Sequence, residues 1–214
     1  MNEIILVCDD LFGLEVYTVM EQVNRWDREH GNEPRYRILG YISDSEVPFG
    51  NFKSSMKRLG GIQDWKPTGD EQYALGIRMP ERKRAVVEQL KANGCTFCTV
   101  VSPWIIGSIT EIEEGSVVCA YSMKVGLHIG KYTTILNPMM GAFAKNIGDY
   151  STILHFSNII GDIGENTYVG NHVFLSSCKN IGDNCYVEDG SIIVKNVKSG
   201  TRVSGVPARK MKAN

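Results

Sequence analysis

The second half of the chain repeats one short pattern, in which an aliphatic residue is followed by glycine or by an acidic or polar residue. A period of about six residues with an aliphatic start is typical of a parallel β-helix, where short strands form the flat faces of a coil. The aliphatic residue points into the coil, and the small or turn-forming residue after it tolerates the backbone angles of a corner. The pattern predicts a coil whose function lies between turns or between copies of the chain. The repeats start at Ile112, Ile129, Ile147, Ile163, Val169 and Ile181.

The first hundred residues have a different pattern, in which short apolar runs alternate with segments of helical spacing. Such alternation predicts a small, Rossmann-like α/β domain with a parallel sheet. Pro103 marks the junction, since proline disfavours continuing the preceding element. We expect the α/β domain at 1–103, the β-helix at 104–195 and a basic tail at 196–214. The expected strands are 4–8, 36–42, 73–77 and 96–101, with a helix after the first, a second helix opened by Pro80, and an irregular crossover over 45–70.

Composition excludes several classes of protein. A formal net charge of -1 argues against a surface built for nucleic acid. The N-terminus lacks a signal-peptide pattern, and no apolar run approaches the roughly 20 residues that span a bilayer. We therefore expect a cytoplasmic protein without membrane insertion. Its six cysteines, including the Cys95 and Cys98 pair, are expected to be reduced and mostly buried.

The N-terminal strand-loop-helix unit, the repeats and the ending Gly205-Val206-Pro207-Ala208-Arg209 resemble the bacterial sugar O- and N-acyltransferases of the hexapeptide family. The resemblance covers nearly the whole chain and is to the type of sialic acid O-acetyltransferase and bacillosamine-pathway N-acetyltransferase. It implies a homotrimer of left-handed coils. It also implies acetyl-CoA as co-substrate in the groove between adjacent coils, and a sugar or nucleotide-sugar held by the N-terminal domain.

Coenzyme A requires cationic groups for its phosphates and a narrow groove for its pantetheine arm. The segment 195–214 contains six Lys and Arg residues and no acidic residue, which fits those phosphates. The alternative is a solvated tail whose charge only aids solubility. The resemblance implies a coenzyme site that includes Gly170, Asn171, Ser176, Ser177, Arg202, Arg209 and Lys210.

The loop after the first strand departs from the family pattern. Relatives carry a glycine-rich turn there, which lets backbone N–H groups approach a phosphate at the helix start. Here only Gly13 remains, and Asp9 and Asp10 stand where the phosphate is expected. Ser43 and Asp44 match the place where relatives present acidic residues to the sugar nucleotide, and a plain turn is the alternative. The expected substrate site is therefore Asp10, Gly13, Ser43 and Asp44, with any sugar nucleotide in an unusual pose.

Acyl transfer from a thioester to a hydroxyl or amine needs a base and a donor to the oxyanion. On the family pattern, Phe143 or Ala144 takes the place of the catalytic histidine, and Thr152 takes that of a second histidine. His155 lies a few residues beyond and is the candidate for a relocated base, since imidazole titrates near neutrality. Asn137 matches a family asparagine beside the acetyl group, with a buried asparagine ladder as its alternative role.

Two functions from different classes follow. The first is an acetyl-CoA-dependent acyltransferase acting on an amino or hydroxyl group of a sugar, in surface glycan synthesis. The second is a trimeric binding or scaffolding protein that has lost catalysis. His128 and His172 fit outward-facing corner positions of the coil, and His30 lies in a polar loop. The spacing of the histidines does not match a metal-dependent hydratase on the same coil, so no metal site is expected.

Overall fold

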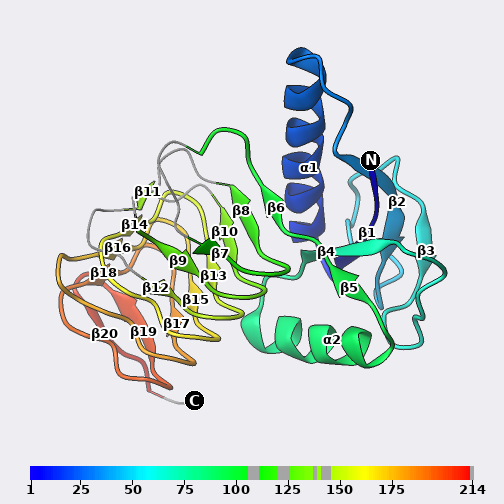
Figure 1. Cartoon of the computed structure of the whole chain (residues 1–214). Coiled ribbons are helices and arrows are strands. Elements are labelled where there is room, and N and C mark those ends of the chain that lie inside the picture. The colour runs from blue at the N-terminus through cyan, green and yellow to red at the C-terminus, as the bar shows by residue number, and fades with distance from the viewer. Residues whose placement is uncertain (106–110, 120–125, 137–138, 141–145, 213–214) are drawn as a thin grey trace. The chain divides into compact units, whose positions relative to one another are not determined.

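The computed structural model describes residues 1–105, 111–119, 126–136, 139–140 and 146–212 (Figure 1). The chain divides into two compact units, Met1–Pro103 and Trp104–Asn214. Among the described helices, none combines the length and the apolar character needed to cross a bilayer. All six cysteines are free, and five of them are buried.

The first unit is a five-stranded sheet in the order β3-β2-β1-β4-β5, with every neighbouring pair parallel. Parallel strands need a crossover, and two of the crossovers are the helices α1 and α2. Its elements are β1 (Asn2–Cys8), α1 (Phe12–Glu29), β2 (Tyr36–Ile42), β3 (Arg58–Gly60), β4 (Gln72–Gly76), α2 (Pro80–Ala92), β5 (Thr96–Phe97) and β6 (Val100–Val101).

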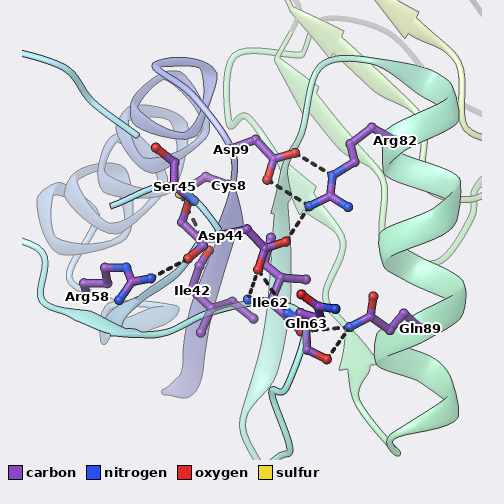
Figure 2. Close-up of polar contacts among 11 residues, drawn as sticks. Cys8, Asp9, Ile42, Asp44, Ser45, Arg58, Ile62, Gln63, Arg82 and Gln89 are labelled. Atoms are coloured by element: carbon purple, nitrogen blue, oxygen red, sulfur yellow. Dashed lines mark hydrogen bonds and ion pairs between the residues drawn. The ribbon is translucent and has the colours of Figure 1, made fainter. Parts of the chain in front are cut away.

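Burial explains why the central strand is a continuous apolar run. Ile4, Ile5, Leu6 and Val7 of β1 are all at most 1% exposed, as expected for a parallel strand covered on both faces. Figures 1 and 2 show α1 and α2 on opposite sides of this sheet. The strand order turns around between β1 and β4, which is the position where open α/β sheets bind ligands at their carboxyl edge.

Two details of the first unit differ from the sequence prediction. The segment 45–70, expected to be irregular, contains the edge strand β3, because the backbone of Tyr41 and Ile42 offers it a partner. The last expected strand is divided into β5 and β6. Between them the N–H of Cys98 donates to the carbonyl of Tyr73.

The second unit is a parallel β-helix whose short strands stack in three groups, which confirms this part of the predicted fold. The first group is β8 (Val117–Cys119), β10 (Thr134–Leu136), β13 (Thr152–Ile153), β15 (Tyr168–Val169), β17 (Tyr186–Val187) and β19 (Arg202–Gly205), with β20 (Ala208–Lys210) antiparallel at the end. The second is β11 (Met139–Met140), β14 (Asn158–Ile159), β16 (Phe174–Leu175) and β18 (Ile192–Ile193). The third is β7 (Glu111–Ile112), β9 (His128–Ile129) and β12 (Asn146–Ile147).

The register places equivalent aliphatic residues directly above one another. Ile147 bridges to Ile163, and Ile163 bridges to Ile181, so a coil of 16 residues is followed by one of 18. These side chains are at most 2% exposed and form the centre of the apolar core. The alternation in coil length accounts for the irregular spacing of the repeats in the sequence.

Small hydroxyl side chains satisfy the backbone inside one corner of the coil. Ser151 Oγ donates to the carbonyl of Gly164 at 2.7 Å and accepts the N–H of Thr167 at 3.0 Å. Thr167 Oγ1 repeats this arrangement one coil further on, donating to the carbonyl of Gly182 and accepting the N–H of Cys185. Buried backbone groups require such partners, so Ser151 and Thr167 are structural residues.

The C-terminal boundary of the coil differs from the expected one at residue 195. Ile181 bridges to Val197, and β19 pairs in parallel with β17. The Gly205-Val206-Pro207 segment then turns the chain back, so that β20 pairs with β19. Much of the segment expected to be a basic tail therefore forms the last coil, because Val197 and Val203 have apolar columns to join.

A substitution at Gly148 tests how closely successive coils approach each other. A Cβ atom at this position would lie 2.4 Å from the backbone nitrogen of Glu165, which rigid backbone cannot accommodate. We expect Gly148→Ala to lower the free energy of unfolding by about 1–3 kcal/mol, as overpacking does. Urea denaturation followed by circular dichroism measures the change. Glu165→Ala, an exposed neighbour, is the control and should stay within about 0.5 kcal/mol of the parent. An equal effect of the two substitutions contradicts the packing argument.

Candidate functional site

The first candidate site is the carboxyl edge of the sheet in the first unit (Figure 2). Residues that follow β1, β2 and β4 meet at this edge, since these strands are parallel neighbours. They include Asp9, Asp10, Asp44 and Arg78. We call these residues, together with Arg82 of α2, the carboxylate edge.

Arg82 joins the loops after β1 and β2. Its Nε donates to Asp9 Oδ2 at 2.9 Å, and its Nη2 donates to Asp44 Oδ2 at 2.7 Å (Figure 2). Hydrogen bonds from Arg82 to Asp9, opposed by partial burial and joined by the contact with Asp44, raise the pKa of the guanidinium. The sequence did not identify Arg82, because it lies 73 residues from Asp9 along the chain.

Asp44 is held from two sides. Its Oδ1 accepts the backbone N–H groups of Ile62 at 2.8 Å and Gln63 at 3.0 Å (Figure 2). Burial alone would raise the pKa of Asp44, but these bonds and the bond from Arg82 outweigh it and lower the pKa below its ordinary value. Both carboxylate oxygens of Asp44 therefore already accept hydrogen bonds from the same chain.

The other predicted substrate residues also lie at this edge. Asp10 Oδ1 accepts the N–H of Phe12 at 2.9 Å, and its Oδ2 lies 3.5 Å from Nη2 of Arg78. Packing explains the glycine at position 13, because a Cβ atom there would lie 2.5 Å from Cβ of Cys8. Ser43 is buried, and its Oγ accepts the N–H of Ser45 at 3.1 Å. The structure thus brings these residues together, each with a contact inside the protein.

The second candidate site is a cavity at the last coil of the second unit. Its volume is about 520 Å³, and its lining includes Lys195, Lys198, Arg209 and Lys210. Ala208 and Val194 contribute apolar surface. No carboxylate belongs to the lining among the residues described there. Cations beside apolar surface suit a ligand that carries both phosphates and an alkyl arm. We call this the cationic cavity.

Other predicted coenzyme residues lie elsewhere on the coil. Arg202 pairs with Glu188 and its guanidinium stacks 4.4 Å from the ring centre of Tyr186, and it does not line the cavity. The N–H of Asn171 donates to Asp189 Oδ1 at 2.8 Å, and a Cβ on Gly170 would lie 2.2 Å from that oxygen.

Two serines were also predicted to bind the coenzyme. The backbone N–H of Ser176 donates to the carbonyl of Ile193, and Ile193 is one of the residues that line the cationic cavity. Ser177 follows it and is exposed. Ser176 therefore lies one coil from the cationic cavity.

The predicted base, His155, lies at one corner of the coil. It is half-buried and precedes Phe156, which is 69% exposed and has a φ of 58°. Phe156 stacks on the ring of His172 at 5.2 Å between centres, and the N–H of His172 donates to the carbonyl of His155. Positive φ recurs at other corners of the coil, such as Tyr132 and His172, so it is the exposure of the Phe156 ring that distinguishes this corner. Asn137, the other predicted catalytic residue, lies outside the described residues.

His128 has a chemical setting that sequence reasoning missed. Its Nε2 lies 2.8 Å from Glu113 Oε1, and its Nδ1 lies 2.7 Å from Asn146 Oδ1. The hydrogen bond with Asn146 contributes most to raising the pKa of His128, burial opposes it, and contacts with Glu113 and Glu111 add to the rise. The available signal was the register, which places His128 and Asn146 one coil apart, each before a core isoleucine. The described residues contain no group of His, Cys, Asp and Glu that could hold a metal ion.

Comparison with solved structures identifies the fold over the whole chain. The acetyltransferase domain of PglB from Neisseria gonorrhoeae has 16% sequence identity and a TM-score of 0.67, covering 99% of this chain and 100% of that one. Over its whole length, the chain therefore has the fold of that acetyltransferase domain. A mutant of GDP-perosamine N-acetyltransferase from Caulobacter crescentus, in complex with CoA and GDP-perosamine, has 14% identity and a TM-score of 0.71, covering 100% and 98%.

WeeI from Acinetobacter baumannii has 19% identity and a TM-score of 0.58, covering 99% of this chain and 100% of that one. No family model matches the sequence. The resemblance drawn from the repeats is thus confirmed as a likeness of fold, at an identity too low to carry residue roles.

The contacts of His128 make a pH-dependent contribution to the coil. Because they raise its pKa in the folded state, their stabilisation is fully present below the ordinary value of about 6.5 and is lost as pH rises through the folded value. We expect the parent to have a higher Tm than His128→Gln at low pH, with the difference narrowing between about pH 6 and pH 8. Glu113→Gln should show the same narrowing. A Tm difference between parent and variant that stays constant over this pH range contradicts the assignment of the pH dependence to His128.

Proposed function

We propose that this protein is an acetyl-CoA-dependent acyltransferase that acts on an amino or hydroxyl group of a sugar. The observation that carries the proposal is the cationic cavity on the last coil of a β-helix. The fold is shared over the full chain length with structures that hold acetyl coenzyme A or CoA. A left-handed coil, a homotrimer and a role in surface glycan synthesis belong to this proposal.

The cationic cavity supplies what the coenzyme requires. Lys195, Lys198, Arg209 and Lys210 offer donors to phosphate oxygens, and Arg can bind them in a bidentate manner. The apolar surface of Val194 and Ala208 suits the pantetheine arm. Of the predicted coenzyme residues, Arg209 and Lys210 therefore take the central role. Arg202 is assigned to the fold through its pair with Glu188.

The reaction needs one proton transfer and one acyl transfer. The sugar nitrogen or oxygen attacks the thioester carbonyl while a base takes its proton. The C–S bond of the tetrahedral intermediate then breaks, and the base returns the proton to the sulfur, so that the coenzyme leaves as a thiol. We assign the base to His155, whose imidazole lies at the coil surface beside Phe156 and His172. Asn137 remains the proposed group that orients the acetyl carbonyl.

A second function is kept because of one observation. On the family pattern, Phe143 or Ala144 takes the place of one histidine and Thr152 that of a second, and Thr152 is fully buried. Without a relocated base, the chain is a trimeric binding or scaffolding protein. The exposed apolar side chains of Phe156, Phe174 and Val194 on the coil are available for contacts between copies in either case.

Coenzyme binding tests the role of the cationic cavity. We expect calorimetric titration to show saturable binding of acetyl-CoA, and Arg209→Ala/Lys210→Ala to weaken it about tenfold or more, as expected when charged hydrogen bonds to phosphate are lost. Arg25→Ala/Lys66→Ala removes the same charge from exposed sites in the first unit and is the control. Absence of acetyl-CoA binding to the parent favours the scaffolding function, and equal affinity of the two variants removes the cavity from the proposal.

Turnover tests the base. In a thiol-release assay over a panel of amino sugars and their UDP and dTDP conjugates, we expect His155→Ala to lose turnover while it still binds acetyl-CoA, because an alanine cannot accept the proton. His172→Ala, at the same corner, is the matched control and should keep turnover. Parent-like turnover of His155→Ala contradicts the assignment.

A further inference from the structure

The carboxylate edge differs from a phosphate site in the groups that accept hydrogen bonds from its donors. A phosphate at the carboxyl edge of such a sheet binds the first N–H groups of a helix, loop N–H groups and guanidinium groups. The first unit has all three kinds of donor at this edge, and Figure 2 shows the loop N–H groups and the guanidinium groups. In each case a carboxylate of the same chain already accepts from them.

The helix donor is taken by Asp10. Its Oδ1 accepts the N–H of Phe12 at 2.9 Å, in the first turn of α1. A carboxylate there satisfies an N–H that has no partner within the helix and also complements the helix dipole. Its Oδ2 faces Arg78 at 3.5 Å, so the second charge near this helix start is also engaged.

The loop donors are taken by Asp44. Two successive N–H groups, of Ile62 and Gln63, converge on its Oδ1 at 2.8 and 3.0 Å. Converging backbone N–H groups of this kind form anion-binding concavities in many phosphate sites. Together with the bond from Arg82, these bonds outweigh the effect of burial and lower the pKa of Asp44, so they favour its anionic form.

Two carboxylates accept hydrogen bonds from the guanidinium group of Arg82. Arg82 donates to Asp9 through Nε and to Asp44 through Nη2. Arg58, the third arginine near this edge, donates to the carbonyl of Ser43 and lies 3.3 Å from Glu46.

Charge decides between possible ligands of this edge. In the ion pairs described here, four carboxylates face three guanidinium groups, so these pairs contain one carboxylate more than guanidinium groups. A diphosphate would have to displace the carboxylates from their donors and leave them close to its own charge. Hydroxyl and ammonium groups instead donate to carboxylate oxygens and leave the ion pairs in place. The carboxylates are Asp9, Asp10, Asp44 and Glu46, and the guanidinium groups are Arg58, Arg78 and Arg82.

We propose that Asp9, Asp10 and Asp44 stand in for a ligand phosphate, so that this edge receives the acceptor sugar through hydroxyl or amino groups and excludes a nucleoside diphosphate. The inference rests on the proposed function, because it names the class of acceptor. It assigns the acceptor as a sugar that is not carried on a nucleotide. The ion pairs then stay formed when the acceptor binds, and no ligand phosphate breaks them.

Titration with UDP and GDP tests the proposal. The coenzyme also contains a diphosphate, so the titrations are done with acetyl-CoA saturating. We expect no saturation of the parent up to about 1 mM of either nucleotide. Asp9→Asn/Asp10→Asn keeps the side-chain shapes and removes two negative charges, and we expect it to bind UDP or GDP at least tenfold more tightly than the parent.

Glu33→Gln/Asp70→Asn is the matched control, since it removes the same charge at the amino edge, before β2 and β4. It should gain no affinity. If Asp9→Asn/Asp10→Asn does not fold, Asp10→Asn alone replaces it, because the Asp10 side chain is 48% exposed. Circular dichroism and thermal unfolding of each variant check its folding.

Two results overturn the proposal. The first is saturable binding of UDP or GDP to the parent with a Kd below about 0.1 mM and its loss in Arg82→Gln. The second is that Asp9→Asn/Asp10→Asn folds and gains no more affinity for UDP or GDP than the control variant gains. Failure of acetyl-CoA binding is a separate result, which removes the proposed function. In that case the nucleotide titrations without acetyl-CoA still report on this edge.

Discussion

Stacking of one coil on the next at the spacing of hydrogen-bonded strands, about 4.8 Å, is the constraint on which the second unit depends. It places each residue above its equivalent, so that aliphatic side chains form continuous columns in the core. It also leaves no room for a Cβ at Gly148, and it lets the hydroxyl groups of Ser151 and Thr167 bond the backbone of the next coil. The cationic cavity exists because this stacking ends, with β20 folded back on β19.

The first unit depends on a different constraint, the meeting of parallel strand ends at one edge. The buried run of β1 fixes the sheet, and the turn around between β1 and β4 opens a place for a ligand. Arg82 then determines the character of that place, since it binds Asp9 and Asp44 together (Figure 2). A glycine-rich turn would leave the helix N–H groups to a ligand, whereas Asp10 uses one of them.

The net charge of -1 hides two regions of opposite character. In the described ion pairs of the carboxylate edge, the carboxylates outnumber the guanidinium groups by one, and the cationic cavity is lined by four Lys and Arg residues. Each region suits one substrate of the proposed reaction: the cavity suits a coenzyme with phosphates, and the edge suits an acceptor that offers hydroxyl or amino groups. The chemistry of transfer is assigned to a third place, the corner with His155 and Phe156.

The sequence alone determined the parallel β-helix, the α/β unit before it and the basic C-terminal segment, because these follow from local periodicity and composition. It also named Asp44, Arg209 and Lys210, which the structure places in the two candidate sites. Only the tertiary structure decided that Arg82 joins Asp9 to Asp44, that His128 faces Glu113 and Asn146, and that the tail from 196 continues the coil. The reason is physical: these contacts join residues that are distant in the chain, and they depend on register and on packing between elements, which no local pattern encodes.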